Sequence, residues 1–220
     1  MKTFSSLLAI LSLSCGLLFG TPRAFDPQVI ETLKSKLNTQ RIEYFFGSIG
    51  VEVLDIESSA FVEKRVSSLY SIDEQGQQIM RTLAIVDFNQ PVHPDLRQAH
   101  LEILKGGAIG TTLQKHDWKI TKKPIYFSTI PLSRAVMEWM DETETHEAAV
   151  HMYQLEVTRK DALALIPYCM IIEIHNPQYL TSEYLEALYN DQFYQHQERT
   201  AAIDSLISRC SELMEIFPAP

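Results

Sequence analysis

A single acidic side chain lies inside a segment that otherwise has the composition of a buried β-strand. Glu173 stands in Tyr168–Ile174, where the other residues are apolar apart from the hydroxyl of a tyrosine and the thiol of a cysteine. Burying an ionised carboxylate costs several kcal/mol unless the group is paired, or else the group takes up a proton and becomes neutral. Buried carboxyl groups often act as general acids or bases, so Glu173 is the first candidate for chemistry.

Arg81 presents the same problem with the opposite charge. It lies in Ile79–Val86, a second apolar segment, and the two-residue period of a strand places it on one face with Leu83 and Ile85. Two interpretations remain open. Arg81 and Glu173 could form an internal ion pair, or they could form the walls of a cavity that binds an anion.

The composition limits the classes of protein to which the chain can belong. Its 220 residues, 45% of them hydrophobic, suffice for one globular domain with or without a helical appendage. The formal net charge of −9, with no lysine-rich stripe, argues against a nucleic-acid-binding protein. An anionic small molecule remains compatible with this charge, because the local field of a pocket can oppose the sign of the whole protein.

The first 24 residues differ from the rest and predict a signal peptide. Lys2 precedes an uncharged apolar segment, residues 7–20, which is shorter than the roughly 20 residues needed to span a bilayer but suits a signal-peptide core. This predicts a periplasmic or secreted protein without a stable membrane span. The alternatives are lipidation at Cys15 and a buried helix in a cytoplasmic protein. Removing this segment leaves Cys169 and Cys210, either as a disulfide or as two buried thiols.

The remaining chain alternates helices with hairpin-linked strands. Apolar spacing and caps predict helices, whereas two-residue alternation predicts strands. The expected helices cover residues 27–46 (with a capping signal at Asn38 that can interrupt it), 96–104, 108–116, 132–142 and 179–216. The expected strands cover residues 51–56, 62–72, 77–88, 118–129, 149–159 and 164–175. Gly76 suits the turn between the second and third strands. These elements predict an α+β fold, an antiparallel sheet with helices packed on one side.

Two patterns that look like known motifs do not fit them. Gly106–Gly110 is rich in glycine, but it follows a helix and contains neither GxGxxG nor GxxxxGK. His146 and His151 resemble the zinc motif HExxH, but a spacing of five separates them by about 140° on a helix. They therefore cannot share an ion in the way that this motif does. A GxSxG sequence, which would mark a nucleophilic serine, is also missing from the chain.

Four blocks that follow one another along residues 28–177 form a more specific pattern. The first is QVIETL followed by LNTQRIE, and the second is the hairpin RVSSLY and MRTLAI, which carries Arg65 and Arg81. The third is AIGTTL and the fourth is MIIEIHNP. Together they resemble the chorismate lyase (chorismate pyruvate-lyase) family. The resemblance implies a chorismate lyase-like domain over residues 25–177, followed by a C-terminal helical extension over residues 178–220.

The resemblance also implies a reaction and the residues for it. Members of this family eliminate pyruvate from chorismate, a ring with two carboxylates, to give 4-hydroxybenzoate, and the family implies neither a metal nor an organic cofactor. Arginine forks suit carboxylates, so by resemblance Arg65 and Arg81 bind the substrate. Glu173 would bind the ring hydroxyl and act as the general acid or proton relay. The backbone at Ile109 and Gly110 would close over a carboxylate. The expected partner is thus a small anionic carboxylate, and the oligomeric state stays open.

Some features of this chain differ from the family pattern. Asn38 occupies a site-lining position at which the family has an apolar methionine, and His151–Leu155 replaces an arginine-rich strand. Chorismate is a cytoplasmic metabolite, whereas residues 1–24 predict export. Two hypotheses follow. The first is a lyase that acts on chorismate or a related enol-ether dicarboxylate. The second is an exported, non-catalytic module that binds a small aromatic or cyclic carboxylate in the same cavity.

Overall fold

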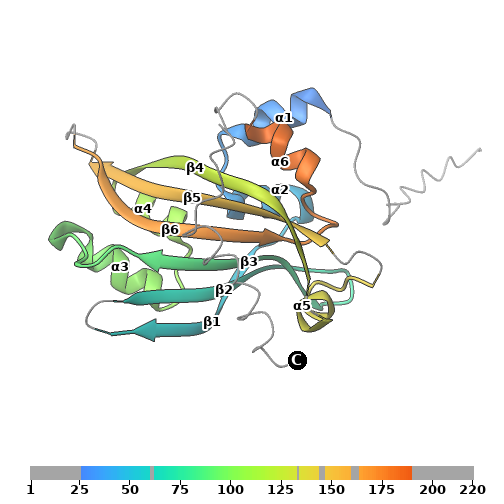
Figure 1. Ribbon diagram of the computed structural model, residues 1–220, viewed down its shortest axis with the longest axis horizontal. Coiled ribbons are helices and arrows are strands. Elements are labelled where there is room, and N and C mark those ends of the chain that lie inside the picture. The colour runs from blue at the N-terminus through green and yellow to red at the C-terminus, as the bar shows by residue number, and fades with distance from the viewer. Residues whose placement is uncertain (1–25, 60–61, 133, 144–146, 160–163, 190–220) are drawn as a thin grey trace, which may run out of the picture.

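A six-stranded antiparallel sheet forms the centre of the molecule in the computed structural model (Figure 1). The structure describes residues 26–59, 62–132, 134–143, 147–159 and 164–189. The strands, in chain order, are β1 (Gly50–Ser58), β2 (Glu63–Ile72), β3 (Gln78–Phe88), β4 (Trp118–Pro131), β5 (Glu147–Arg159) and β6 (Ile166–His175). The helices are α1 (Pro27–Lys34), α2 (Asn38–Phe46), the short 3₁₀ helix η1 (Pro94–Leu96), α3 (Arg97–Leu104), α4 (Ile109–Lys115), α5 (Arg134–Trp139) and α6 (Ser182–Tyr189).

The order of the strands is β1-β2-β3-β6-β5-β4, and each neighbouring pair is antiparallel. The predicted α+β class with an antiparallel sheet is therefore confirmed. β6, the last strand among the described residues, lies between β3 and β5, so it is central and has a hydrogen-bonded neighbour on each side. A strand in this position is buried on both faces, which explains the nearly continuous apolar sequence around Glu173.

The helices divide the faces of the sheet among them. Leu83 and Ile85 on β3 point to one face, where they share a core with α5. Ala84 and Val86 point to the opposite face, as the strand alternation requires. On that face α1, α2 and α6 pack over one end of the sheet, and α3 and α4 pack over the other end (Figure 1). Most of the helices thus lie on one side, and the space between their two groups is the place where a cavity can form.

The hairpin of β2 and β3 forms as predicted but contains an irregularity. Gly76 adopts a φ of +81° in the turn, and the Asp73 carboxylate accepts hydrogen bonds from two backbone amides of the same turn. Further along the hairpin, Leu69 pairs with Thr82, and the next residue, Tyr70, pairs with Met80. Arg81 is therefore the additional residue of a β-bulge, where the regular alternation of side chains is interrupted.

The N-terminal helical region is divided into two helices. α1 ends at Lys34 and α2 begins at Asn38, so the break comes slightly before the position that the sequence indicated. Leu37 is extended, and its backbone N–H donates to the side chain of Gln40 in the first turn of α2. This break turns the start of α2 toward the sheet, and Asn38 is consequently 4% exposed.

The remaining predictions concern the edges of the molecule. The pairing of β4 with β5 shifts register between Pro124 and Tyr126, and the strand tolerates the proline because β4 lies at the edge of the sheet. The predicted helix over residues 179–216 is present as α6 in its described part, and the rest lies outside the described residues, as does the segment 1–24. Within the described ranges, no helix has the length and apolar character needed to cross a membrane. Cys169 is a buried free thiol, and Cys210 lies outside the described residues.

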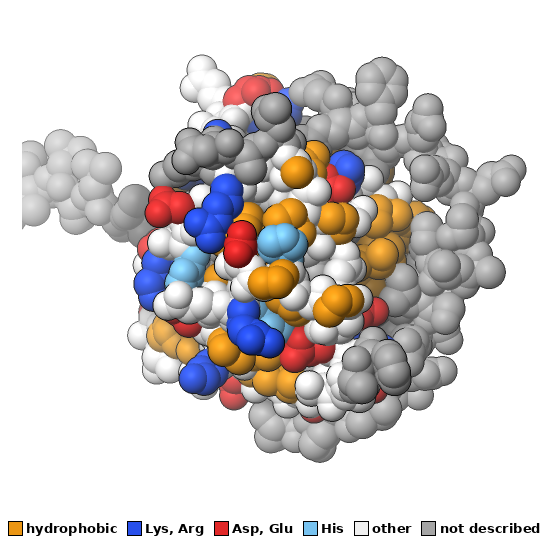
Figure 2. All heavy atoms as spheres, turned by 90° about the vertical axis from the view of Figure 1, so that its left-hand side faces the viewer, with side chains coloured by type: hydrophobic (Ala, Val, Ile, Leu, Met, Phe, Trp, Pro, Cys, Tyr) orange, Lys and Arg blue, Asp and Glu red, His pale blue; other side chains and the backbone are white. Residues whose placement is uncertain are grey.

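The surface at the end of the molecule nearest α3 carries both signs of charge. Figure 2 views this end and shows acidic, basic and histidine side chains mixed with apolar ones. On the face that this view shows, the positive charges do not form one continuous patch.

Candidate functional site

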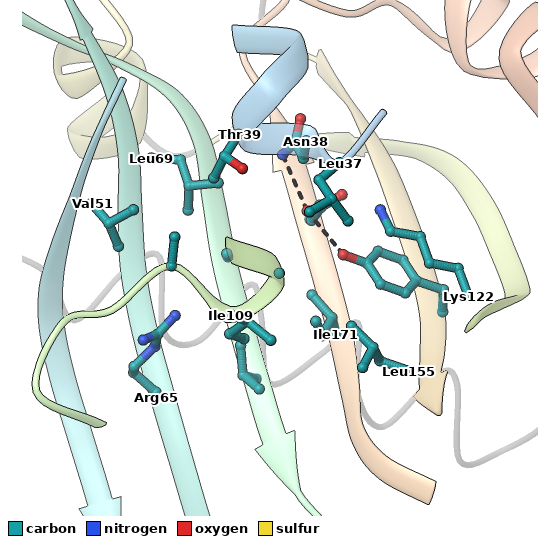
Figure 3. Close-up of a pocket in the computed structure, with 16 residues that line it drawn as sticks. Leu37, Asn38, Thr39, Val51, Arg65, Leu69, Ile109, Lys122, Leu155 and Ile171 are labelled. Carbon is teal, nitrogen blue, oxygen red and sulfur yellow. Dashed lines mark hydrogen bonds between the residues drawn. The ribbon is translucent and has the colours of Figure 1, made fainter. Parts of the chain in front are cut away.

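A cavity lies on the helical face of the sheet, between the start of α2 and the start of α4 (Figure 3). The empty space in it is about 510 Å³, part of which is open to solvent. Apolar side chains form most of its wall, and the polar groups are few. The lining residues are Leu37, Asn38, Thr39, Val51, Arg65, Leu69, Ala84, Val86, Ala108, Ile109, Gly110, Lys122, Tyr153, Leu155, Ile171 and Glu173.

Glu173 projects from the central strand β6 into the wall of the cavity. Two donors fix its Oε1 atom: the Asn38 amide at 3.1 Å and the Tyr153 hydroxyl at 3.0 Å (Figure 3). Burial raises the pKa of Tyr153 well above its ordinary value, so its hydroxyl remains protonated and donates. Among the described residues no hydrogen bond to Oε2 is recorded. Since Oε1 already accepts two hydrogen bonds, a proton carried by Glu173 would be placed on Oε2.

Asn38 is itself held in a fixed orientation. Its Oδ1 atom accepts a hydrogen bond from the Tyr179 hydroxyl at 2.7 Å, and its Nδ2 atom also donates to Thr82 at 3.1 Å. The amide can therefore not rotate to present its oxygen to Glu173. The asparagine at this position thus places a donor on the glutamate. A polar network of this kind fixes a single arrangement of the site.

Two histidines lie next to Glu173 but do not line the cavity. His175 follows two residues later on β6, and its Nε2 atom is 3.9 Å from Glu173 Oε2. His151 lies directly opposite Glu173 on β5. Burial lowers the pKa of His175 to about 4 and lowers the pKa of His151 well below its ordinary value. Both imidazoles are therefore neutral at pH 7. Neither histidine was predicted from the sequence to lie at the site.

Arg65 lies at one side of the cavity on β2. Its Nη1 atom donates to the backbone carbonyls of Ile103 at 2.6 Å and Gly107 at 2.9 Å, so it holds the loop between α3 and α4. The Nε atom is buried and makes no hydrogen bond to any described residue. Arg65 is 2% exposed, and burial lowers its pKa. Nη1 thus holds the fold, whereas Nε remains available to a ligand.

Lys122 lies at the opposite side of the cavity from Arg65 (Figure 3). It pairs with Leu155 across β4 and β5, and both residues line the cavity. Its Nζ atom is buried, lies 4.4 Å from the centroid of the Tyr153 ring and has no hydrogen-bond partner within the described residues. A buried ammonium without an acceptor is costly in the absence of a ligand. Lys122 is the cationic residue of the site that the sequence analysis missed.

Arg81 does not line the cavity. Its Nε atom donates to Ser71 at 2.8 Å, and its guanidinium stacks on the ring of Phe46, 3.9 Å from the centroid. Burial lowers the pKa of Arg81 to about 10. No ion pair joins Arg81 to Glu173 in the described part of the chain. Neither interpretation of Arg81 from the sequence corresponds to this placement, because the bulge turns the side chain toward the end of α2.

Ile109 and Gly110 begin α4 and line the cavity. A Cβ atom at Gly110 would collide with the side chain of Leu37, which follows α1 and precedes α2. Glycine therefore allows the start of α4 to approach the start of α2 closely. The structure thus brings together five of the six predicted site residues: Asn38, Arg65, Ile109, Gly110 and Glu173.

Comparison with known proteins gives little further information. No protein-family model and no curated protein matches the chain. Among solved structures, the chain is similar to a transcriptional regulator of the GntR family from Bacillus cereus, with 13% identity and a TM-score of 0.38 over 60% of this chain and 94% of that one. It is also similar to a gene product of Staphylococcus aureus, with 8% identity and a TM-score of 0.42 over 60% of this chain and 87% of that one. Likenesses this weak identify neither a family nor a ligand.

Proposed function

We propose that the cavity binds a small cyclic dicarboxylate and that the protein eliminates pyruvate from chorismate or a related enol ether. The observation that carries this proposal is that Glu173 lines the same cavity as Arg65 and Lys122, which lie on opposite sides of it (Figure 3). The resemblance of the four sequence blocks to the chorismate lyase family supports the same reaction. Lys122 takes the position in this proposal that the sequence analysis gave to Arg81.

The two cations would bind the two carboxylates of the substrate. The Lys122 ammonium has no competing acceptor among the described residues, so its full capacity is available to a carboxylate. The free Nε atom of Arg65 offers one further charge-assisted hydrogen bond, beside the start of α4. The apolar wall formed by Val86, Leu155 and Ile171 would contact the ring. A dianion would thus relieve the cost of the buried, unpaired cations.

Glu173 would manage the protons of the reaction. The bond between the ring carbon and the enol-ether oxygen breaks, and the neighbouring ring carbon, which bears the hydroxyl, loses a proton as the ring becomes aromatic. One proton is added to the leaving group, which ends as pyruvate. A protonated Glu173 can supply this proton and recover one from the ring carbon. The hydrogen bonds from Asn38 and Tyr153 would hold the carboxyl group in position through both steps.

The test is to mix the purified protein with chorismate and to follow the absorbance of 4-hydroxybenzoate. We expect turnover that is lost in Glu173→Gln, which keeps the size of the side chain but cannot transfer the proton. Glu156→Gln is the matched control, because Glu156 is also a buried glutamate of the sheet but lies outside the cavity and pairs with Lys123. Absence of turnover in the folded wild-type protein would refute the action on chorismate.

A second candidate is a binding module without catalysis. It is favoured by the commitment of Arg65 Nη1 to backbone carbonyls and by the position of Arg81 outside the cavity, since both leave fewer groups for a substrate. Such a module would bind 4-hydroxybenzoate or another ring carboxylate tightly and leave chorismate unchanged. Calorimetric titration with 4-hydroxybenzoate, run beside the turnover assay, distinguishes the two candidates.

A further inference from the structure

Three potential metal ligands gather on one face of the sheet beside the cavity. Glu173 and His175 are two residues apart on β6, so they point to the same face. The sheet register places His151 directly opposite Glu173 on β5. One ligand atom from each of the three residues lies within 4.8 Å of the others. The set consists of E-x-H on one strand and a histidine on the next, and it does not involve His146, whose spacing the sequence analysis rejected.

The potential ligand atoms are already oriented by other groups. His175 Nδ1 is hydrogen-bonded to the Thr82 hydroxyl at 3.1 Å, which directs Nε2 toward Glu173. Glu173 Oε1 is held by Asn38 and Tyr153, which directs Oε2 toward the same imidazole. Such partners behind the ligands are typical of metal sites, where they set the tautomer and the ring orientation. In this site Asn38 and Tyr153 would therefore also orient Glu173 as a metal ligand.

One of these atoms is an unsatisfied polar group in the interior. His175 is 1% exposed, and its Nε2 atom has no hydrogen-bond partner among the described residues. Its distance of 3.9 Å to Glu173 Oε2 is too long for a hydrogen bond. Two ligands that are each about 2.1 Å from a metal lie roughly 3.0–3.4 Å apart in octahedral or tetrahedral geometry. A contraction of less than about 1 Å would thus place both atoms on one ion.

The three side chains offer donor atoms of the kinds that metal sites use, two imidazole nitrogens and one carboxylate oxygen. We propose that His151, Glu173 and His175 bind a first-row divalent cation such as Zn²⁺ or Fe²⁺. Two histidines and one carboxylate suit these ions and leave coordination positions for water or a further ligand. No metal was expected from the sequence, because local residue types do not determine the register that sets His151 opposite Glu173.

The charges around the site set its strength. The Glu173 carboxylate favours a positive charge beside His175, whereas the positive charges of Lys122 and Arg41 disfavour one. Arg41 is fixed by a 2.7 Å hydrogen bond to the Tyr189 hydroxyl, so it cannot move away. The ion should therefore bind more weakly than in a site with the same ligands and no neighbouring cations. Removing the charge of Lys122 should strengthen its binding.

The experiment uses Co²⁺ as a spectroscopic probe of the full chain. Chelator-treated protein is titrated with Co²⁺, and the visible absorbance of the bound ion is recorded; the metal content of protein loaded with Zn²⁺ is measured by mass spectrometry. We expect a saturable, stoichiometric signal in the wild type that is lost in His175→Asn and in His151→Asn. Asparagine at position 175 can still bond to Thr82 but has no atom in place of Nε2. His93→Asn, at an exposed histidine, is the matched control.

A measurement on the wild type covers the case in which a variant does not fold. With histidine labelled by ¹⁵N, addition of Zn²⁺ should shift the ring-nitrogen signals of two histidines only. Absence of stoichiometric binding in the folded wild type would overturn the proposal. Binding that persists in both folded variants, or ring shifts at other histidines, would overturn it as well.

The metal site and the proposed lyase can be tested separately. Metal content and ¹⁵N shifts do not depend on turnover, so a protein that binds Zn²⁺ without lyase activity would refute only the lyase. A protein that eliminates pyruvate but binds no ion would refute only the metal site. If both are present, they compete for Glu173, because an ion on Oε2 keeps the carboxylate ionised. Loading with Zn²⁺ should then lower the lyase rate, and a chelator should restore it.

Discussion

Replacing Lys122 by methionine should weaken ligand binding and stabilise the free protein at the same time. In the free protein the Lys122 ammonium is buried without a hydrogen-bond acceptor among the described residues. Within the described part of the chain, the ammonium contacts the face of the Tyr153 ring, 4.4 Å from its centroid. Methionine keeps most of the length of the side chain and removes the charge. The substitution therefore removes a group that the folded protein needs only when an anion is present.

The size of both effects follows from general magnitudes. A hydrogen bond between charged groups contributes about 1.5–3 kcal/mol, which corresponds to a loss of about 10- to 150-fold in affinity for a ring dicarboxylate. A buried polar group without a partner costs about 1–3 kcal/mol, so its removal stabilises the folded protein by that amount. The substitution also removes the contact of the ammonium with the ring, which destabilises the folded protein by about 0.5–2 kcal/mol. The net stabilisation is thus about 1 kcal/mol, or a rise of about 2–4 °C in Tm for a domain of this size.

Calorimetric titration with isophthalate, a rigid ring dicarboxylate, measures the first effect, and thermal unfolding without ligand measures the second. Lys119→Met is the matched control, since Lys119 is on the same strand but is exposed and lies outside this cavity. It should change neither quantity. A Lys122 variant with unchanged affinity would remove this residue from the site. A variant with a lower Tm would show that the ammonium is satisfied in the free protein, contrary to the argument.

Four further predictions test other parts of the structure. Tyr153→Phe removes one of the two donors to Glu173 and should lower the free energy of unfolding by about 1.5–3 kcal/mol in urea titrations, with a parallel loss of turnover. Arg81→Met should leave the affinity for isophthalate within twofold of the wild type while lowering stability, because its contacts are structural. Burial raises the pKa of the Cys169 thiol, so in a variant without the other cysteines a thiol reagent at pH 8 should react only after denaturant is added. Residues 1–24, fused to a reporter that is active only outside the cytoplasm, should give activity if they direct export, and an inactive, intact fusion would exclude it.

The sequence predicted those parts of the site that depend on one strand or one turn. A lone acid in an apolar segment identified Glu173, because a buried strand tolerates a carboxylate only when other groups stabilise it. The turn at Gly76 and the antiparallel hairpin followed from local residue types. The start of α4 at Ile109 could also be predicted, since the glycines before it end the preceding helix.

The sequence did not predict the cationic side of the cavity, for two physical reasons. The assignment of Arg81 assumed regular alternation, and a bulge of one residue is sufficient to turn its side chain away. Lys122 stands next to Lys123 and before a proline, a context that indicates an exposed edge strand rather than a binding site. Its direction is set by the register of β4 against β5, in which Lys122 pairs with Leu155, and local residue types do not determine that register.

The position of β6 between β3 and β5 connects these observations. It gives Glu173 a neighbour on each side: Ala84, whose small side chain leaves room for the cavity, and His151, which offers a metal ligand. The two carboxylate oxygens consequently have different surroundings, with neutral donors at Oε1 and an imidazole at Oε2. Lys122 acts in opposite directions on the two proposed sites, since it attracts an anion into the cavity and repels a cation from the histidines. Lys122→Met should therefore weaken carboxylate binding and strengthen metal binding. If Lys122 and Glu173 had only structural roles, the substitution would not change the two affinities in opposite directions.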